Sequence, residues 1–232
     1  MSPSATLTLE KLVEADRTHE CEGFGSQKIC VRIAAVAHLP SRFGDFQVVG
    51  FTNNKDGKEH AAFVHGDVVG QEDVPIRMHS ECLTGDAIGS LRCDCRDQLE
   101  AALVALGKME RGVLLYLRQE GRGIGLTNKI RAYQLQDRGL DTVEANHALG
   151  FRDDERDYSV AAHMIHSLRV KSVALMTNNP KKLKGLEEMG ILVTRRIPHI
   201  MEPNAFNAAY LRTKQAKSGH LLTEQGEEGP PT

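Results

Sequence analysis

The stretch VALMTNNPKKLKGLEEMGILVTRRI, residues 173–197, decides the fold class. It opens with the apolar run VALM, which is typical of a buried strand. Asn179 then suits the N-cap of a helix, Pro180 its first position, and Gly190 the residue just past its end. The closing run LVTRRI predicts a second strand. Together these signals predict a compact βαβ unit, whose helix offers free N–H groups to an anion at its N-terminus.

The segments before this unit extend the prediction to the whole chain. Four short apolar runs, separated by Gly, Asn and Asp turns, predict an antiparallel β region: Cys30–Leu39, Phe46–Phe51, Ala61–Val64 and Val74–Met78. Helical spacing of leucines follows over residues 99–106, and Val113–Leu117 predicts a buried strand. A second helix, ending near Gly139, would carry Leu126, Ile130 and Tyr133 on one apolar face, and a third would span Tyr158–Leu168.

The expected fold is therefore mixed α+β and α/β, with an N-terminal antiparallel β region followed by βα units in a single compact catalytic domain, residues 29–217. Residues 203–217 predict a final amphipathic helix. Residues 1–28 are expected to form a mobile N-terminal extension, and the polar Pro/Gly composition of residues 218–232 predicts a disordered tail.

Composition limits the classes of function. The 232 residues are 41% hydrophobic, which suits a folded core. Their 29 basic and 31 acidic residues nearly balance, so no overall field attracts nucleic acid or a membrane. Neither a signal peptide nor a membrane-spanning run is evident, so a cytoplasmic protein is expected. A phosphate ligand would need a local basic site.

Three of the five cysteines, Cys82, Cys93 and Cys95, fall within fourteen residues. In a reducing compartment this spacing favours metal ligands over disulfides, and three thiolates supply three of the four tetrahedral positions around zinc. On a strand, Cys93 and Cys95 would point the same way. A catalytic site with an open position, a structural site completed by another Cys or His, and three buried free thiols all remain open at this point.

Two further segments favour an anion site. The run RQEGRGIG, residues 118–125, links a strand to a helix, so its glycines allow backbone amides to approach a phosphate, although a simple turn explains it as well. Lys181 and Lys182 lie at a helix start, where cations oppose the macrodipole unless an anion is bound there. A capped surface helix with solvated lysines is the alternative. By composition alone, residues 151–157 would be a solvated charged loop and Tyr133 a core residue.

Three long motifs carry a resemblance: HSECLTGDAIGSLRCDC (79–95), LRQEGRGIGLTNKIRAYQLQDRGLDTVEANHALGFRDDERDY (117–158) and TNNPKKLKGLEEMGI (177–191). In this order they resemble GTP cyclohydrolase II, and the likeness runs from about Cys30 to Leu222. The resemblance implies that Cys82, Cys93 and Cys95 hold one zinc ion with an open position for an activated water. It also implies contacts with GTP from Arg77, Met78, His79, Ser80, Glu81, Gln98, Glu120, Gly121, Arg122, Thr142, Thr177 and Lys182.

The same resemblance implies a reaction. Asp154 matches the family's proton acceptor, Arg156 its nucleophile and Tyr133 its catalytic tyrosine. Arg156 would attack the α-phosphorus of GTP and release pyrophosphate, with Mg²⁺ shielding the phosphates, and a zinc-activated water would add to C8 of guanine. Ring opening and loss of formate would give 2,5-diamino-6-(5-phospho-ribosylamino)pyrimidin-4(3H)-one, the first step of riboflavin synthesis. A stand-alone homodimer is expected from the family.

Alternatives follow from departures and from other classes of protein. Arg96 follows the third cysteine where many family members have glycine, and it places a cation beside the cluster. A paralogue that stops at the formamidopyrimidine, or that serves a secondary-metabolite pathway, is the alternative enzyme. A silent guanine-nucleotide or zinc-binding regulatory module is the alternative from another class. A zinc module that binds nucleic acid is disfavoured, because the net charge is slightly negative and basic and aromatic residues are not interleaved.

Overall fold

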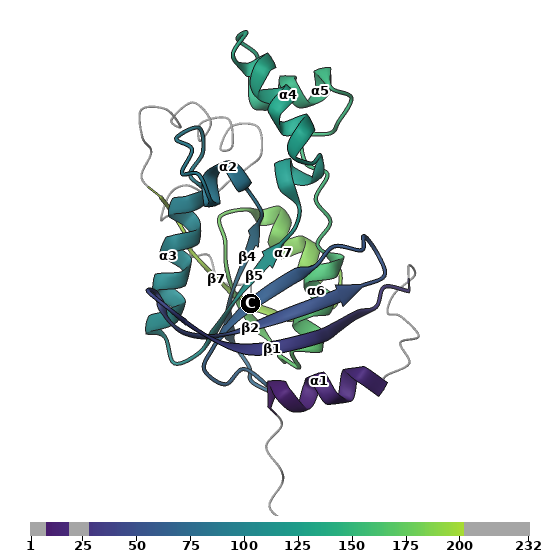
Figure 1. Cartoon of the computed structure of the whole chain (residues 1–232), viewed down its shortest axis with the longest axis vertical. Coiled ribbons are helices and arrows are strands. Elements are labelled where there is room, and N and C mark those ends of the chain that lie inside the picture. Colours follow the sequence, from purple (N-terminus) through teal and green to yellow (C-terminus); the bar gives the residue numbers. More distant parts are fainter. Residues whose placement is uncertain (1–7, 19–27, 202–232) are drawn as a thin grey trace, which may run out of the picture.

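The computed structural model describes residues 8–18 and 28–201, which form a seven-stranded mixed sheet with helices on both faces (Figure 1). The strands lie in the order β1-β2-β3-β5-β4-β6-β7. In chain order the elements are α1 (Leu9–Thr18), β1 (Val31–Ser41), β2 (Gly44–Asn53), β3 (His60–His65), β4 (Val74–Ser80), α2 (Leu83–Asp86), α3 (Cys95–Lys108), β5 (Gly112–Leu117), the 3₁₀ turn η1 (Glu120–Gly123), α4 (Leu126–Gln136), α5 (Thr142–Ala148), α6 (Ser159–Ser167), β6 (Val173–Met176), α7 (Pro180–Glu187) and β7 (Val193–Ile197).

The sheet has an antiparallel and a parallel half, which meet at β5. Strands β1, β2, β3 and β5 pair antiparallel, whereas β5, β4, β6 and β7 pair parallel. The mixed fold class expected from the sequence is confirmed. The assignment of residues 74–78 to the antiparallel region is wrong, because β4 lies between β5 and β6 and is parallel to both. Helices α2 and α3 form a crossover between β4 and β5, and such a crossover returns the chain in the same direction.

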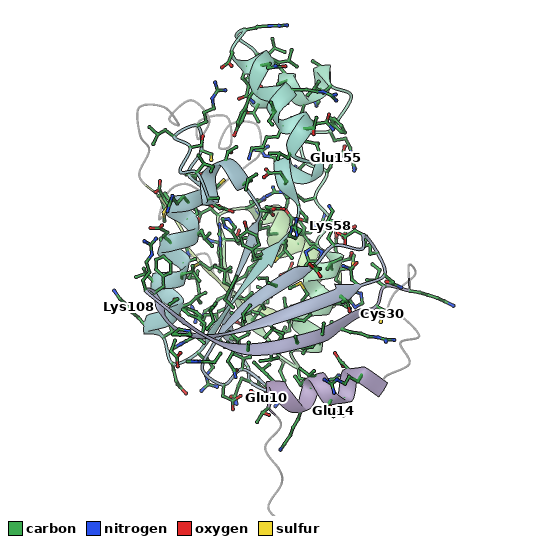
Figure 2. All side chains as sticks on the ribbon, in the orientation of Figure 1. Glu10, Glu14, Cys30, Lys58, Lys108 and Glu155 are labelled. Carbon is green, nitrogen blue, oxygen red and sulfur yellow. The ribbon has the colours of Figure 1, made fainter. Side chains whose placement is uncertain are left out.

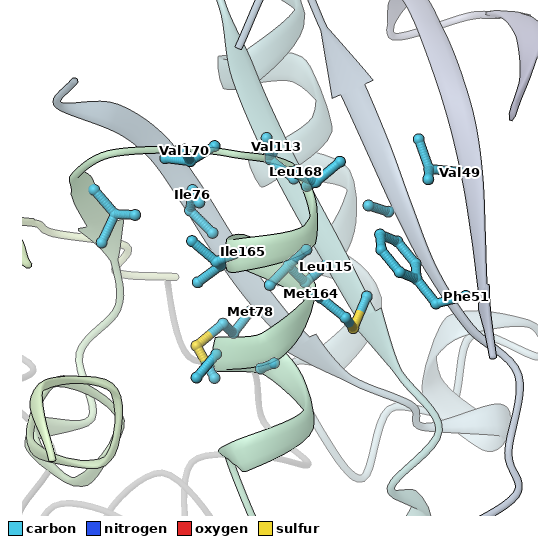
Figure 3. Packing of buried hydrophobic residues seen from close by; sticks show 14 of the residues in the cluster. Val49, Phe51, Ile76, Met78, Val113, Leu115, Met164, Ile165, Leu168 and Val170 are labelled. Atoms are coloured by element: carbon cyan, nitrogen blue, oxygen red, sulfur yellow. The ribbon is translucent and has the colours of Figure 1, made fainter. Parts of the chain in front are cut away.

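Each face of the sheet buries its own hydrophobic cluster. Met164, Ile165 and Leu168, from α6 and its C-cap, pack on a face that includes Phe51 and Leu115 (Figure 3). The opposite face packs against α3 through a second cluster of buried residues: Phe46, Ala102, Leu106, Leu114 and Met176. Neighbouring β5 residues therefore serve different clusters, as the alternation of a strand requires.

The βαβ unit formed by β6, α7 and β7 has the caps expected from the sequence. The Asn179 side chain accepts a hydrogen bond from the Lys181 amide at 2.9 Å, and Pro180 opens the helix. Gly190 follows with a φ of +79°, a left-handed conformation that glycine adopts without strain. This unit confirms the local part of the prediction.

Helix α1 lies within the segment that the sequence assigned to an N-terminal extension. It packs against β1, and its Leu9 and Leu12 are buried in the core, while Glu10 and Glu14 are exposed (Figures 1 and 2). The helix expected over residues 203–217 and the tail expected over 218–232 lie outside the described residues.

Helices α4 and α5 project from one end of the sheet (Figure 1). Helix α5, which the sequence analysis did not anticipate, begins with a capping box in which Asp141 and Glu144 satisfy each other's backbone amides. The expected apolar face of α4 is wrong for Ile130, which is 48% exposed, whereas Lys129 and Ala132 are buried. None of the described helices is long and apolar enough to cross a bilayer.

Candidate active site

A cavity of about 530 Å³ opens beside the carboxyl ends of β4, β5 and β6 and reaches α4 and α5. Ligands of parallel α/β sheets typically bind at this edge. Sixteen of the residues that the sequence predicted for the site line the cavity: Arg77, His79, Ser80, Glu81, Cys82, Cys93, Cys95, Gln98, Glu120, Gly121, Arg122, Tyr133, Thr142, Arg156, Thr177 and Lys182.

Two predicted residues do not line it. The Met78 side chain is fully buried in the sheet core, and only its carbonyl oxygen faces the site, where it accepts a hydrogen bond from Lys182 Nζ at 2.7 Å. Asp154 lies behind Arg156 and accepts two hydrogen bonds from its guanidinium group. Met78 therefore contacts the site through Lys182, and Asp154 contacts it through Arg156.

The three cysteines converge on one point. Their Sγ atoms lie within 4.8 Å of one another, and those of Cys82 and Cys93 are 3.7 Å apart. Zn–S bonds of about 2.3 Å at a tetrahedral angle separate two sulfurs by about 3.8 Å, so the cluster fits a zinc ion. Cys95 is the first residue of α3 and Cys93 lies in the loop before it, so the expected strand geometry is wrong. A loop that turns into a helix brings the thiols together instead.

Gly85, in α2, packs directly against this cluster. A Cβ at this position would lie 2.9 Å from Cys93 Sγ, 3.0 Å from Cys82 Sγ and 2.9 Å from the Cys95 Cβ. Only glycine leaves room for the sulfurs of Cys82 and Cys93 and the Cβ of Cys95, and a lone glycine in the sequence gave no sign of this close approach.

The cluster concentrates negative charge on Cys82. Hydrogen bonds with the Cys93 and Cys95 thiols, together with the charge of Lys129, hold the pKa of Cys82 well below its usual range. The hydrogen bond with Cys82, burial and the charge of the Cys82 thiolate raise the pKa of Cys93 to about 11. A bound cation would favour the thiolate form of all three, because metal binding displaces thiol protons.

Lys129 is a neighbour of the cluster that the sequence analysis missed. Its buried ammonium group donates to Cys82 Sγ at 3.1 Å and to Glu120 Oε1 at 2.8 Å. Glu120 also accepts from the amides of Gly121 at 2.8 Å and Leu83 at 2.6 Å. Through Glu120, the glycine-rich turn of residues 118–125 is thus hydrogen-bonded to the loop that carries Cys82.

A second buried carboxylate supports the same loop. Asp86 accepts from the Cys82 amide at 3.0 Å and from the Tyr116 hydroxyl at 2.8 Å, and it lies 3.0 Å from His79 Nε2. Burial, opposed by Asp86, lowers the pKa of His79. Asp86 was not among the predicted site residues, although it lies within the quoted motif.

Tyr133 faces the cluster from α4. Its hydroxyl lies 3.3 Å from Thr84 Oγ1, and the Arg92 guanidinium stacks over its ring at 4.9 Å from the centroid. Burial raises the pKa of Tyr133, so the phenol stays protonated at neutral pH. The interpretation of Tyr133 as an ordinary core residue is therefore wrong.

Arg156 enters the cavity from the loop between α5 and α6. It forms a two-pronged ion pair with Asp154, with Nε···Oδ1 at 2.8 Å and Nη2···Oδ2 at 2.6 Å. Burial alone would raise the pKa of Asp154, but the hydrogen bonds and charge of Arg156 lower it. Glu155 joins this loop to the glycine-rich turn, because its amide donates to the Arg122 carbonyl at 3.0 Å.

Arg77 is a buried cation that lines the cavity. Arg77 donates to the Met176 carbonyl at 3.1 Å and to Gln98 Oε1 at 2.7 Å, and burial lowers its pKa to about 10. Its Nε has no hydrogen-bond partner among the described residues. His199, another residue that the sequence analysis missed, has its pKa lowered to about 4 by burial and by nearby cations, so it is neutral at physiological pH. Cationic and neutral donors are suited to an anionic ligand.

Arg96 points away from this chemistry. Its Nε donates to Glu100 at 3.1 Å along the surface of α3, the side chain is 42% exposed, and it does not line the cavity. The departure from glycine after the third cysteine therefore lies on the outer surface.

Comparisons with known proteins agree with one another. The model of a family described as GTP cyclohydrolase II matches residues 31–198. GTP cyclohydrolase-2 of Picrophilus torridus is 58% identical over 186 residues, covering 80% of this chain and 96% of that protein. GTP cyclohydrolase-2 of Klebsiella pneumoniae strain 342 is 57% identical over 194 residues, covering 84% and 97%. Riboflavin biosynthesis protein RibBA of Bacillus subtilis is 57% identical over 185 residues, covering 79% of this chain and 46% of that longer protein.

Proposed function

Because this chain belongs to the GTP cyclohydrolase II family, we propose that its cavity binds GTP and opens the guanine imidazole ring. Formate and pyrophosphate leave, and the product is 2,5-diamino-6-(5-phospho-ribosylamino)pyrimidin-4(3H)-one. One observation carries the proposal: the three-cysteine cluster, the Asp154–Arg156 pair and the buried cations Arg77 and Lys182 meet at one cavity. A nucleotide has a base and a polyphosphate, so it needs two such regions side by side.

Arg156 acts at the phosphate end. Its guanidinium group attacks the α-phosphorus, the bond from that phosphorus to the bridging oxygen breaks, and pyrophosphate leaves. Water later cleaves the new N–P bond, which restores Arg156 and releases the product as its 5′-phosphate. A charged guanidinium is a poor nucleophile, so a proton must pass to a base as the N–P bond forms. Asp154 is that base, because both its oxygens already accept hydrogen bonds from Arg156. Arg122 and Lys182, with Mg²⁺, balance the charge of the phosphates.

Cys82, Cys93 and Cys95 act at the base end. They would hold zinc, which supplies a polarised water for hydrolysis at C8 of guanine. Tyr133 presents a protonated hydroxyl on the same side of the cavity, where it donates a proton or a hydrogen bond to the opening ring. Loss of formate requires a second hydrolysis, and Tyr133 favours completion of this step.

Product analysis tests the function. Zinc-loaded protein is incubated with GTP and Mg²⁺, and products are identified by mass spectrometry with parallel formate and pyrophosphate assays. One formate and one pyrophosphate per GTP are expected. A formamide product without formate would identify the paralogue that stops halfway, and unchanged GTP would reject the proposal.

Two variants separate the two ends of the site. Arg156→Ala is expected to lose pyrophosphate release and ring opening while keeping its zinc. Cys93→Ser is expected to lose zinc and ring opening. A zinc-free wild-type protein with full activity would remove the metal from the proposal. The expected homodimer remains a prediction, which light scattering of the full chain tests.

A further inference from the structure

We propose that Lys129 is a positioning residue of the metal centre, which fixes the Cys82 thiolate by a hydrogen bond and orients the cluster for the metal. The inference rests on the proposed metal site, and it assigns a role to a residue that the family motifs did not single out. It concerns binding of the metal itself and is therefore open to measurement without substrate.

The contacts of Lys129 are those of a buried cation held between two partners. The residue is only 8% exposed, and its Nζ lies 3.1 Å from Cys82 Sγ and 2.8 Å from Glu120 Oε1. A buried ammonium group is costly unless it is paired and hydrogen-bonded. Both partners are anionic when Cys82 is a thiolate, so Lys129 offsets charge on both.

Glu120 extends the arrangement to the backbone beside the ligand. Its second oxygen accepts from the Leu83 amide at 2.6 Å, directly after Cys82. The side chain of Cys82 is therefore held by Lys129 and its backbone by Glu120, which are themselves an ion pair. Partners that hold metal ligands in this way typically change metal affinity 10–100-fold when they are removed.

The position of Lys129 on α4 links the metal to the tyrosine. Lys129 and Tyr133 are four residues apart, so they lie on the same side of the helix. Lys129 Nζ lies 5.8 Å from the Tyr133 ring centroid. A hydrogen bond from Lys129 to Cys82 thus fixes the distance between the cluster and the face of α4 that carries Tyr133.

A purely structural explanation gives a different expectation. If Lys129 served only to neutralise Glu120, then removing both charges together would restore the site. If Lys129 acts on the thiolate, the site stays impaired after both charges are removed. The decisive comparison is therefore between Lys129→Met and the double variant Glu120→Gln/Lys129→Met.

The experiment measures zinc affinity by competition with a chromophoric chelator, using the full chain without GTP. We expect Lys129→Met to bind zinc at least tenfold more weakly than wild type, the double variant to remain at least tenfold weaker, and Lys129→Arg to lie between Lys129→Met and wild type. The matched control is Lys182→Met, which removes another buried lysine of the same cavity that bonds to the Met78 carbonyl and is expected to keep wild-type zinc affinity.

Cobalt substitution provides a readout that a general loss of stability would not move. The thiolate-to-Co²⁺ charge-transfer band reports the electron density on the sulfurs, so losing the Lys129 hydrogen bond is expected to shift it in Lys129→Met but not in Lys182→Met. Zinc affinity within twofold of wild type in Lys129→Met, or its full recovery in the double variant, would overturn the inference. A wild-type chain that binds no zinc would instead overturn the proposed metal site.

Discussion

Substituting Gly85 by alanine is the sharpest single test of the metal site. The new Cβ would lie 2.9 Å from Cys93 Sγ and 3.0 Å from Cys82 Sγ. Favourable contacts of this kind begin at about 3.5 Å, so the sulfurs or α2 must move by about half an ångström. A metal site tolerates deviations of only about 0.2 Å in its ligand distances, so the three thiolates are expected to hold zinc more weakly.

The magnitude divides into two parts. Overpacking alone is expected to lower the free energy of unfolding by about 1–3 kcal/mol. A tenfold loss of zinc affinity adds about 1.4 kcal/mol when zinc is present well above its dissociation constant, because bound ligand stabilises the native state. The variant should therefore lose more stability with zinc than with a chelator.

Urea unfolding with and without buffered zinc, together with chelator competition, measures both parts. Gly50→Ala is the matched control, because its added Cβ approaches nothing closer than the Ala35 carbonyl at 4.0 Å. Zinc affinity within twofold of wild type in Gly85→Ala would refute the claim that the sulfurs around this glycine form the metal site.

Three other predictions address other parts of the molecule. Gly123→Ala places a Cβ 2.9 Å from the Glu155 carbonyl at a φ of +97°, so we expect turnover to fall at least tenfold while zinc affinity is unchanged. An equal loss of turnover and of zinc affinity would contradict an effect confined to this turn. Asp154→Asn should destabilise the fold at pH 7, because the pKa of Asp154 is lower in the folded state and its ionised form therefore stabilises that state. This stabilisation is complete above the unfolded-state pKa of about 3.9 and is lost as the pH falls further. Urea unfolding should therefore show the difference in unfolding free energy between variant and wild type narrowing below about pH 4. Ile165→Ala should lower the free energy of unfolding by about 2–5 kcal/mol at constant pH, because the side chain is fully buried. A decrease below about 1 kcal/mol would show that the packing of α6 does not stabilise the core.

Local signals account for what the sequence predicted correctly about the fold. The unit over residues 173–197 combined an N-cap, a proline and a terminal glycine, all of which act within a few residues. The pairing of β4 was beyond such signals, because the short run over residues 74–78 carries no information about its neighbours in the sheet. Helix α5 could have been found, since Asp141 and Glu144 have the spacing of a capping box.

The site was predictable where the residue type itself limits the chemistry. Three closely spaced cysteines predicted a cluster, and the cluster forms. Lys129 was hidden for the opposite reason: the pattern of α4 placed the apolar residues inward, whereas the helix borders a cavity and buries a lysine there. A lysine reveals such a role only through its contacts. Gly85 was hidden because a close approach leaves no trace in a single sequence.

The two halves of the sheet contribute differently to the cavity, yet both support the loop that carries Arg156. The loops after β4, β5 and β6 provide the cysteines, the glycine-rich turn and Lys182, all from the parallel half. The antiparallel half reaches the site through Lys55, between β2 and β3, whose Nζ donates to Asp157 at 2.5 Å and to Ser159 at 2.7 Å. Asp157 follows Arg156 directly, so the proposed nucleophile depends on a contact with the distant half of the fold. Both halves of the sheet thus support one loop, although none of the described residues of β1, β2 and β3 lines the cavity.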